Sequence, residues 1–336
     1  MNRRRFVTVI TRFTLAGACM AALASAAPAA WAQAGTYPNR PIKMILPHGP
    51  GTSPDVVARL LAERLGQALG QAVVIDNRAG AGGMIGAEAA AAAPADGYSV
   101  LFTVKGVLAI GPHLHLNAKY DALRDFRAVT EILQVPHIIT ATPNAPYNSL
   151  KQLVEYAKRN PGKIDYASTG AGGQPHVALE TLASRLGIKL NHIPYKGSPG
   201  ADVMSGVVSL YLEASTTAVP SIKAGKIKAL AISGTERIAS LPDVPTLTEF
   251  NPALDPNGVV GNSWHGIFVP AATPVEIVTR LNSEIVKIIN TPDMQSRLRA
   301  LGLSPTGTLP AALTAALASD FAYWRQLVRE VGVKAE

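Results

Sequence analysis

The chain has 336 residues, of which 48% are hydrophobic and only 16% are charged, and its formal net charge is +8. This composition excludes an intrinsically disordered protein and leaves room for two folded domains. Four arginines lie in residues 1–32, and without these four charges the formal charge is +4. The lysines and arginines that remain form no cluster larger than a pair, so a nucleic-acid partner is not expected.

Residues 1–32 have the pattern of an export signal. Arg3, Arg4 and Arg5 precede an apolar stretch, and Ala30-Trp31-Ala32 forms a small-x-small cleavage site. We therefore expect a periplasmic protein, exported by the Sec or the twin-arginine route. Cys19 is the only cysteine, and Ala16 stands where a lipobox needs leucine or valine, so a lipid anchor is not expected. No later stretch is long and apolar enough for a membrane span, and the mature protein is expected to be soluble.

Short apolar runs alternate with amphipathic segments in the first part of the mature chain. Strands are expected at residues 42–46, 73–76 and 99–104, and helices at residues 54–70 and in the alanine-rich segment before the third strand. Alternation of this kind predicts a doubly wound, mostly parallel α/β sheet.

The second part of the chain repeats this order. The expected strands are residues 134–142, 164–167, 190–193, 207–212, 228–232 and the returning strand 263–270. The expected helices are residues 150–159, 177–186, a segment ending at 205, 273–290 and 309–331. We predict two α/β lobes, each a doubly wound sheet flanked by helices, with a ligand cleft between them. Residues 33–138 plus 263–336 form lobe 1, and residues 139–262 form lobe 2.

Three glycine-rich turns are expected between a strand and a helix. In "HGPGTSPD", Gly49, Gly51 and Thr52 leave backbone N–H groups bare, and Ser53 is placed as the helix N-cap with Pro54 after it. Such a helix start at the carboxyl end of a strand is suited to an anion. A simple capped turn is the alternative, which Asp55 favours because its own carboxylate can interact with the helix dipole.

The other two turns are "NRAGAGG", residues 77–83, and "STGAGGQPH", residues 168–176. The first begins like a dinucleotide fingerprint, but Ile85 stands where the third glycine is needed. The second offers the hydroxyls of Ser168 and Thr169 and lacks the Gly-Lys-Ser/Thr of a phosphate-binding loop. Both turns could contribute N–H donors to the same cleft as the first.

Motifs for bond-breaking chemistry are absent from the sequence. The nucleophile elbow Gly-x-Ser-x-Gly fails around Ser53 and around Ser263. The pair His113 and His115 could bind a metal only with a third ligand, and a surface loop is the preferred interpretation of that segment. No metal and no cofactor are therefore expected. An exported protein with this layout is most simply a solute receptor, although a serine hydrolase that uses Ser53 or Ser263 with a remote histidine stays open.

At these residues the sequence resembles the Bug receptors, the extracytoplasmic solute-binding components of tripartite tricarboxylate transporters. The resemblance lies in "YPNRPIKMILPHGPGTSPDVVARLLAERL", "VVIDNRAGAGGMIGAEAAAAAPADGYSVLF", "HIPYKGSPGADVMSGVVSL" and "WHGIFVPAATPVEIVTRLN". It implies a Venus-flytrap pair of α/β domains that close over one small carboxylate-bearing ligand. Family members hold a ligand carboxylate with the turns that correspond here to residues 47–55 and 168–176.

The resemblance and the turns together give a set of expected ligand-binding residues. These are His48, Gly49, Gly51, Thr52, Ser53, Asp55, Ser168, Thr169, Gly170, Gln174, His176, Tyr195, Lys196 and Glu213. Three features depart from the family pattern: Thr52 replaces a glycine, His48 replaces an aromatic residue, and the segment "GSPGADVM" looks shorter. A threonine adopts positive φ only at a cost, so the first turn is expected to differ in shape or to use the Thr52 hydroxyl.

We therefore expect an extracytoplasmic solute-binding protein and not an enzyme. Its expected partners are a small organic acid and either the membrane permease subunits of a tripartite tricarboxylate transporter or a sensor kinase, and nothing in the sequence requires more than a monomer. The alternative is a periplasmic hydrolase or isomerase on the same two-lobed scaffold, which predicts a serine and a histidine within hydrogen-bond reach in the cleft.

Overall fold

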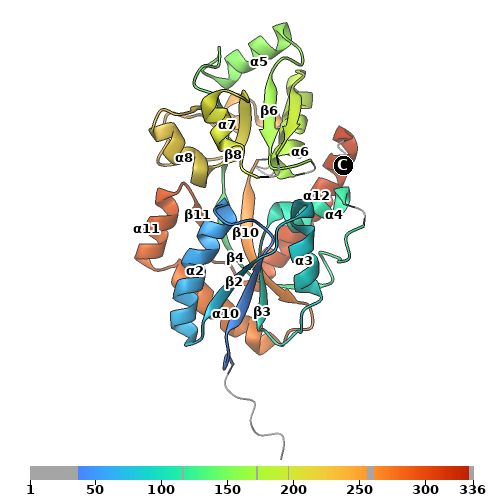
Figure 1. The fold of residues 1–336 in the computed structure, drawn as a ribbon, viewed down its shortest axis with the longest axis vertical. Coiled ribbons are helices and arrows are strands. Elements are labelled where there is room, and N and C mark those ends of the chain that lie inside the picture. The colour runs from blue at the N-terminus through green and yellow to red at the C-terminus, as the bar shows by residue number, and fades with distance from the viewer. Residues whose placement is uncertain (1–36, 116, 172, 196, 256–260, 333–336) are drawn as a thin grey trace, which may run out of the picture. The chain divides into compact units, whose positions relative to one another are not determined.

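The structure is a computed structural model that describes residues 37–115, 117–171, 173–195, 197–255 and 261–332. Residues 40–336 form one compact unit, and the fold below is that of this unit. Two sheets organise it, and both contain strands from distant parts of the chain (Figure 1). In the described residues no helix is long and apolar enough to cross a membrane.

The first sheet has the strand order β11-β4-β10-β3-β1-β2. Its strands are β1 (Ile42–Leu46), β2 (Val73–Asn77), β3 (Ser99–Val104), β4 (Phe126–Val135), β10 (Ser263–Pro270) and β11 (Ser304–Pro305). β1 is parallel to β2 and β3, whereas β10 runs antiparallel to β3 and β4, and β11 is antiparallel to β4. The sheet is therefore mixed, because β10 enters it as a returning strand.

Helices cover both faces of the first sheet. α2 (Ser53–Leu69) and α10 (Val275–Ile289) contact each other on one face, whereas α3 (Met84–Ala91) and α12 (Pro310–Val331) lie on the other (Figure 1). α2 buries Val57, Leu61 and Leu65 and ends at Gly70, where φ is +67°. The remaining elements around this sheet are the 3-10 turn η1 (Ala81–Gly83), the π-helical turn η2 (Gly106–Ile110), α4 (Gly111–Leu114) and α11 (Pro292–Ala300).

The second sheet has the strand order β7-β6-β8-β5-β9. Its strands are β5 (His137–Ala141), β6 (Asp165–Ser168), β7 (Asn191–Pro194), β8 (Leu210–Ala214) and β9 (Lys228–Ile232). The helices that accompany them are α5 (Leu150–Arg159), α6 (Gln174–Leu186), α7 (Gly200–Ser205), α8 (Ser215–Lys223), α9 (Leu247–Phe250) and the 3-10 turn η3 (Pro252–Leu254). β6, β7 and β8 are parallel, and β5 is antiparallel to β8 and β9.

Alternation along β8 shows how this sheet separates two cores. Leu210 and Leu212 pack in the cluster that contains residues of α5 and α6, whereas Tyr211 packs with Val203 of α7 on the other face. Period-two alternation of this kind buries both faces of a strand that carries helices on each side. The strand that we expected at residues 207–212 is β8, which begins at Leu210 and ends at Ala214.

The expected strand at residues 134–142 is wrong as a single strand. The chain forms β4 up to Val135 and β5 from His137, and these two strands belong to different sheets. Pro136 separates them, because proline has no N–H for a sheet ladder. The carbonyl of Pro136 instead accepts a hydrogen bond from the Ser215 N–H at 2.9 Å.

Four strands end where a helical segment begins. β1 leads to α2, β2 leads to η1 and α3, β6 leads to α6, and β8 leads directly to α8. The carboxyl ends of strands in open α/β sheets are where ligands bind. This arrangement brings helix N-termini from both sheets to the candidate site.

Candidate functional site

A cavity of ≈ 770 Å³ adjoins the carboxyl ends of strands from both sheets. Its lining comes from the segments after β1, β2 and β3, from those after β6 and β7, and from β8 and α8. Val135, His137, Ser263 and His265, at the two places where the chain passes between the sheets, also line it. The turns that the sequence singled out therefore meet at one cavity.

Nine of the expected ligand-binding residues line this cavity. They are His48, Gly49, Gly51, Thr52, Ser53, Thr169, Gly170, Gln174 and Tyr195. Asp55, Ser168, His176 and Glu213 are buried and lie outside the lining. Lys196 falls outside the described residues.

The first turn differs from the predicted capped turn. Thr52, not Ser53, is the N-cap of α2, and no side-chain hydrogen bond caps the helix. Positive φ falls on Gly51, at +77°, whereas Thr52 has an extended conformation with φ of −74°. The Thr52 hydroxyl donates to the Gly49 carbonyl at 2.7 Å. The threonine thus braces the turn without the strain that its replacement of a glycine suggested.

Asp55 holds the first turn from behind the cavity. Its carboxylate accepts hydrogen bonds from the Gly51 N–H at 2.9 Å, from Arg59 Nε at 2.9 Å and from Asn77 Nδ2 at 3.0 Å. Burial alone would raise the pKa of Asp55, but these hydrogen bonds outweigh it and lower the pKa to about 2. Asp55 is therefore placed as a positioning residue that stays ionised at neutral pH.

The third turn is shaped by Ser168, which is fully buried at the end of β6. Its hydroxyl lies 2.9 Å from the Gly170 carbonyl and 2.7 Å from His192 Nε2. Gly170 itself has φ of +130°, a conformation that other residues rarely adopt. The His176 ring stacks on the His192 ring with 3.7 Å between centroids. Ser168 and His176 thus support the turn that presents Thr169 and Gly170.

Two further expected residues make contacts within the protein. The Tyr195 hydroxyl donates to Asp202 Oδ2 at 2.7 Å, and this bond is the main reason that the pKa of Tyr195 rises to about 12. Glu213 lies on β8 opposite Ile138, and burial raises the pKa of its carboxyl.

Several lining residues were not among those expected from the sequence. The second turn contributes Gly80 to Gly83, and it was not selected although it also lies between a strand and a helix. A side chain at Gly83 would meet Val107 at 2.6 Å, so the backbone approaches closely there. His115, His137 and His265 also line the cavity, but no motif links them because their positions in the sequence are far apart.

Among the described residues, the lining contains no lysine, arginine, aspartate or glutamate. Burial lowers the pKa of His48 and of His137 to about 4, and that of His265 to about 3, so all three are uncharged near pH 7. The cavity therefore carries no full side-chain charge on these residues, and its polarity comes from hydroxyls, imidazoles and backbone groups.

The N-terminal turns of four helices supply positive potential to this uncharged lining. α2, α3, α6 and α8 all begin at lining segments, and none has a side-chain hydrogen bond at its N-cap. Away from the cavity, Ser149 caps α5 and Thr291 caps α11, whereas α10 and α12 also begin without a side-chain cap. First-turn N–H groups have no partner within a helix, and they favour anions. This cavity is therefore suited to bind a small anion through neutral donors.

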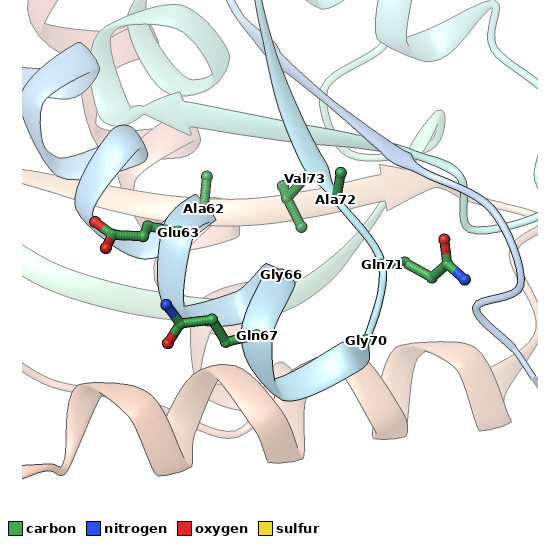
Figure 2. Close-up of a pocket in the computed structure, with 8 residues that line it drawn as sticks. All are labelled: Ala62, Glu63, Gly66, Gln67, Gly70, Gln71, Ala72 and Val73. Carbon is green, nitrogen blue, oxygen red and sulfur yellow. The ribbon is translucent and has the colours of Figure 1, made fainter.

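Two other features of the described residues concern metal ligands and a second hollow. No group of three or more histidine, cysteine, aspartate or glutamate side chains is placed to hold a metal ion there. A separate hollow of ≈ 480 Å³ lies along the second half of α2 and the start of β2, between Glu63 and Val73 (Figure 2). It adjoins the C-terminal end of a helix, whose dipole disfavours an anion.

Comparisons with known proteins agree with this geometry. The sequence model of the family described as "Tripartite tricarboxylate transporter family receptor" matches residues 57–333. The chain is similar to Protein BugT of Bordetella pertussis, with 36% identity over 337 residues, 99% of this chain and 99% of that protein. BugT is thus a relative over nearly its full length.

Two solved structures of similar proteins contain named ligands. One is the R. palustris protein Rpa4515 with adipate, with a TM-score of 0.84 and 30% identity, covering 89% of this chain and 100% of that one. The other is MatC from Rhodopseudomonas palustris with bound malate, with a TM-score of 0.79 and 27% identity, covering 87% and 100%. The chain therefore belongs to the tripartite tricarboxylate transporter receptor (TctC) family of periplasmic solute-binding proteins.

Proposed function

We propose that this protein captures a small carboxylate-bearing ligand in the ≈ 770 Å³ cavity and binds it without changing any covalent bond. The observation that carries the proposal is the meeting of four helix N-termini, none with a side-chain cap, at a lining without charged side chains in the described residues. Fixed N–H donors replace the water around a carboxylate, and their hydrogen bonds to an ionised acceptor are stronger than neutral ones.

The ligands of related proteins support a carboxylic acid. Adipate and malate are both small dicarboxylates, and they are named with two structures that share the fold of this chain over most of its length. In this chain the lining residues that would hold one carboxylate are Gly51, Thr52 and Ser53 in the first turn and Thr169 and Gly170 in the third. Asp55, Ser168 and His176 would act indirectly, by fixing the two turns.

We place the protein in the periplasm, with residues 1–32 as its export signal. Residues 33–138 plus 263–336 would form one lobe and residues 139–262 the other, closing over the ligand. Its partners would be the permease subunits of a tripartite tricarboxylate transporter or a sensor kinase. We propose that it acts as a monomer.

The hydrolase alternative has one observation in its favour. It predicted a serine and a histidine within hydrogen-bond reach, and Ser168 Oγ lies 2.7 Å from His192 Nε2. Ser168 is, however, fully buried and outside the cavity lining, and its hydroxyl also lies 2.9 Å from the Gly170 carbonyl. A nucleophile needs access to the substrate, so this pair fits a role in shaping the turn.

The experiment is a thermal-shift screen of the purified protein against mono- and dicarboxylates, aromatic acids and amino acids, followed by calorimetry on the acids that stabilise it. A receptor shows a rise in Tm with at least one acid, and the acid is recovered unchanged after incubation. Conversion of the acid by the wild type but not by Ser168→Ala would instead support the hydrolase. The absence of binding by every acid would contradict the proposed function.

A further inference from the structure

Three of the four described histidines that line the cavity come from distant parts of the chain and are considered as one cluster: His48, His137 and His265. His48 follows β1, His137 begins β5, and His265 lies on β10. Burial is the main cause of the lowered pKa of His265, and the proximity of His48 and His137 lowers this pKa further. The cluster therefore forms one part of the wall, at the place where the chain passes between the two sheets.

Two ring nitrogens of this cluster are buried without a hydrogen-bond partner. These are His48 Nε2 and His265 Nδ1. Leaving a buried polar group unpaired costs roughly 1–3 kcal/mol, so such groups call for an explanation. His137 differs, because its Nδ1 lies 3.2 Å from the Val135 carbonyl and is engaged by the backbone. His48 and His265 are thus the two rings with polar atoms left for a ligand.

The backbone of His48 and the ring of His265 are held in place from outside the cavity. The backbone carbonyl of His48 accepts a hydrogen bond from Asn77 Nδ2 at 2.9 Å, which ties the first turn to β2. His265 pairs with Val104 and Leu133 in the sheet, and its ring meets the edge of Phe102 at 5.6 Å between centroids. The His265 ring is therefore positioned by packing, and the His48 side chain starts from a fixed backbone, as a selective contact requires.

The chemistry of the cluster selects the kind of group it can bind. A neutral imidazole offers one donor and one acceptor, and burial keeps both rings uncharged near pH 7. Lys105 and Asp320 pair with each other at 3.6 Å and lie outside the lining. A second carboxylate would thus find no counter-charge among the described lining residues, whereas a hydroxyl both donates and accepts.

We propose that His48 and His265 form a subsite for a ligand hydroxyl, so that this receptor selects hydroxy-substituted carboxylic acids over their unsubstituted analogues. The inference rests on the proposed function, in which the turns after β1 and β6 hold the carboxylate. His48 and His265 would then determine specificity and would add little to the binding of an acid without a hydroxyl.

The test is calorimetry with pairs of acids that differ by one hydroxyl: malate and succinate, lactate and propionate, 3-hydroxybutyrate and butyrate. At least one hydroxylated acid should bind about ten- to a hundredfold more tightly than its partner, as expected for a hydrogen bond to buried polar groups. Equal affinities in every pair, or no binding by any hydroxylated acid, overturn the subsite. If unsubstituted acids still bind, the proposed function stands; if no carboxylate binds, it fails as well.

Variants show whether the preference comes from these rings. His265→Phe and His48→Phe should each reduce the preference to less than about threefold, because each should weaken binding of the hydroxylated acid more than binding of its unsubstituted partner. His265→Asn keeps a polar atom near the position of Nδ1 and should restore part of the preference. His48 lies in a turn, so its variant tests the subsite even if the change in β10 impairs folding.

The matched control is His113→Phe, which makes the same chemical change outside the cavity. His113 Nε2 lies 2.9 Å from the Phe321 carbonyl, and its ring packs on Phe321. This variant should keep the wild-type preference. A hydroxyl preference that survives in both His48→Phe and His265→Phe would place the hydroxyl elsewhere and refute the assignment.

Discussion

Replacing Asp55 by asparagine tests the claim that one ionised carboxylate shapes the first turn. Asp55 is only 3% exposed and accepts hydrogen bonds from Gly51, Arg59 and Asn77. Its pKa falls from 3.8 to about 2, and at 1.36 kcal/mol per unit this corresponds to about 2 kcal/mol of folding free energy at pH 7. Arg59 is half-exposed, so salt should weaken its share of this stabilisation.

The sign of the pH dependence follows from the lowered pKa. Stability from Asp55 is complete above pH 4 and is lost as pH falls from about 4 to about 2, because the unfolded chain takes up the proton first. The free energy of unfolding of Asp55→Asn should therefore be about 2 kcal/mol lower than that of the wild type at pH 7. This difference corresponds to a fall in Tm of roughly 4–8 °C. The two proteins should become nearly equal in stability near pH 2.

The assay is urea unfolding of both proteins across this pH range, with calorimetry of ligand binding at pH 7. Affinity should fall in Asp55→Asn, because the Gly51 N–H loses its charged acceptor. Asp96→Asn is the control: its pair with Arg40, at 2.8 Å, is exposed and should change Tm by less than about 1 °C. A variant as stable as the wild type at pH 7, or one with the same deficit at both ends of the range, would refute the reasoning.

Three further predictions concern the lining. His265 has a pKa lowered to about 3 in the folded protein, so wild-type stability should fall as pH drops from 6.5 toward 3, and His265→Phe should flatten this slope by up to about 1.4 kcal/mol per pH unit in urea titrations. Gly170→Ala forces a methyl group onto a residue at φ of +130° and should weaken binding of the acid about tenfold in calorimetry; unchanged affinity would mean that the third turn does not hold it. Gly86→Ala would place a methyl group 2.7 Å from the Pro47 backbone and should cost about 1–3 kcal/mol in unfolding experiments. Gly49→Ala, with no atom within 4 Å of the added carbon, should leave stability nearly unchanged, and equal losses in the two variants would contradict the packing argument.

Local patterns in the sequence predicted those strands and helices whose apolar residues recur at regular spacing. β1, β3 and the long α2 and α10 agree with the expected ranges to within about two residues, because apolar periodicity and the glycine after α2 mark them directly. The break at Pro136 was not predicted, since the apolar residues before and after the proline read as one run. Only the structure shows that the residues before Pro136 belong to a strand of the first sheet and those after it to a strand of the second.

For the candidate site, sequence reasoning found the turns more easily than it found the roles of single side chains. Gly51 and Gly170 line the cavity, as their place between strand and helix suggested. Asp55 and Ser168 proved to bond to those turns from outside the lining, and side-chain direction cannot be read from spacing in a loop. His265 was missed because the contacts that make it notable come from residues more than 100 positions away.

The most direct test of the central claim is a crystal structure of the complex with an acid that is released from the purified protein and identified by mass spectrometry. The account predicts a carboxylate in the cavity whose oxygens accept hydrogen bonds from backbone N–H groups of the turns after β1 and β6. An acid bound outside this cavity, or one whose carboxylate makes no contact with either turn, would contradict it.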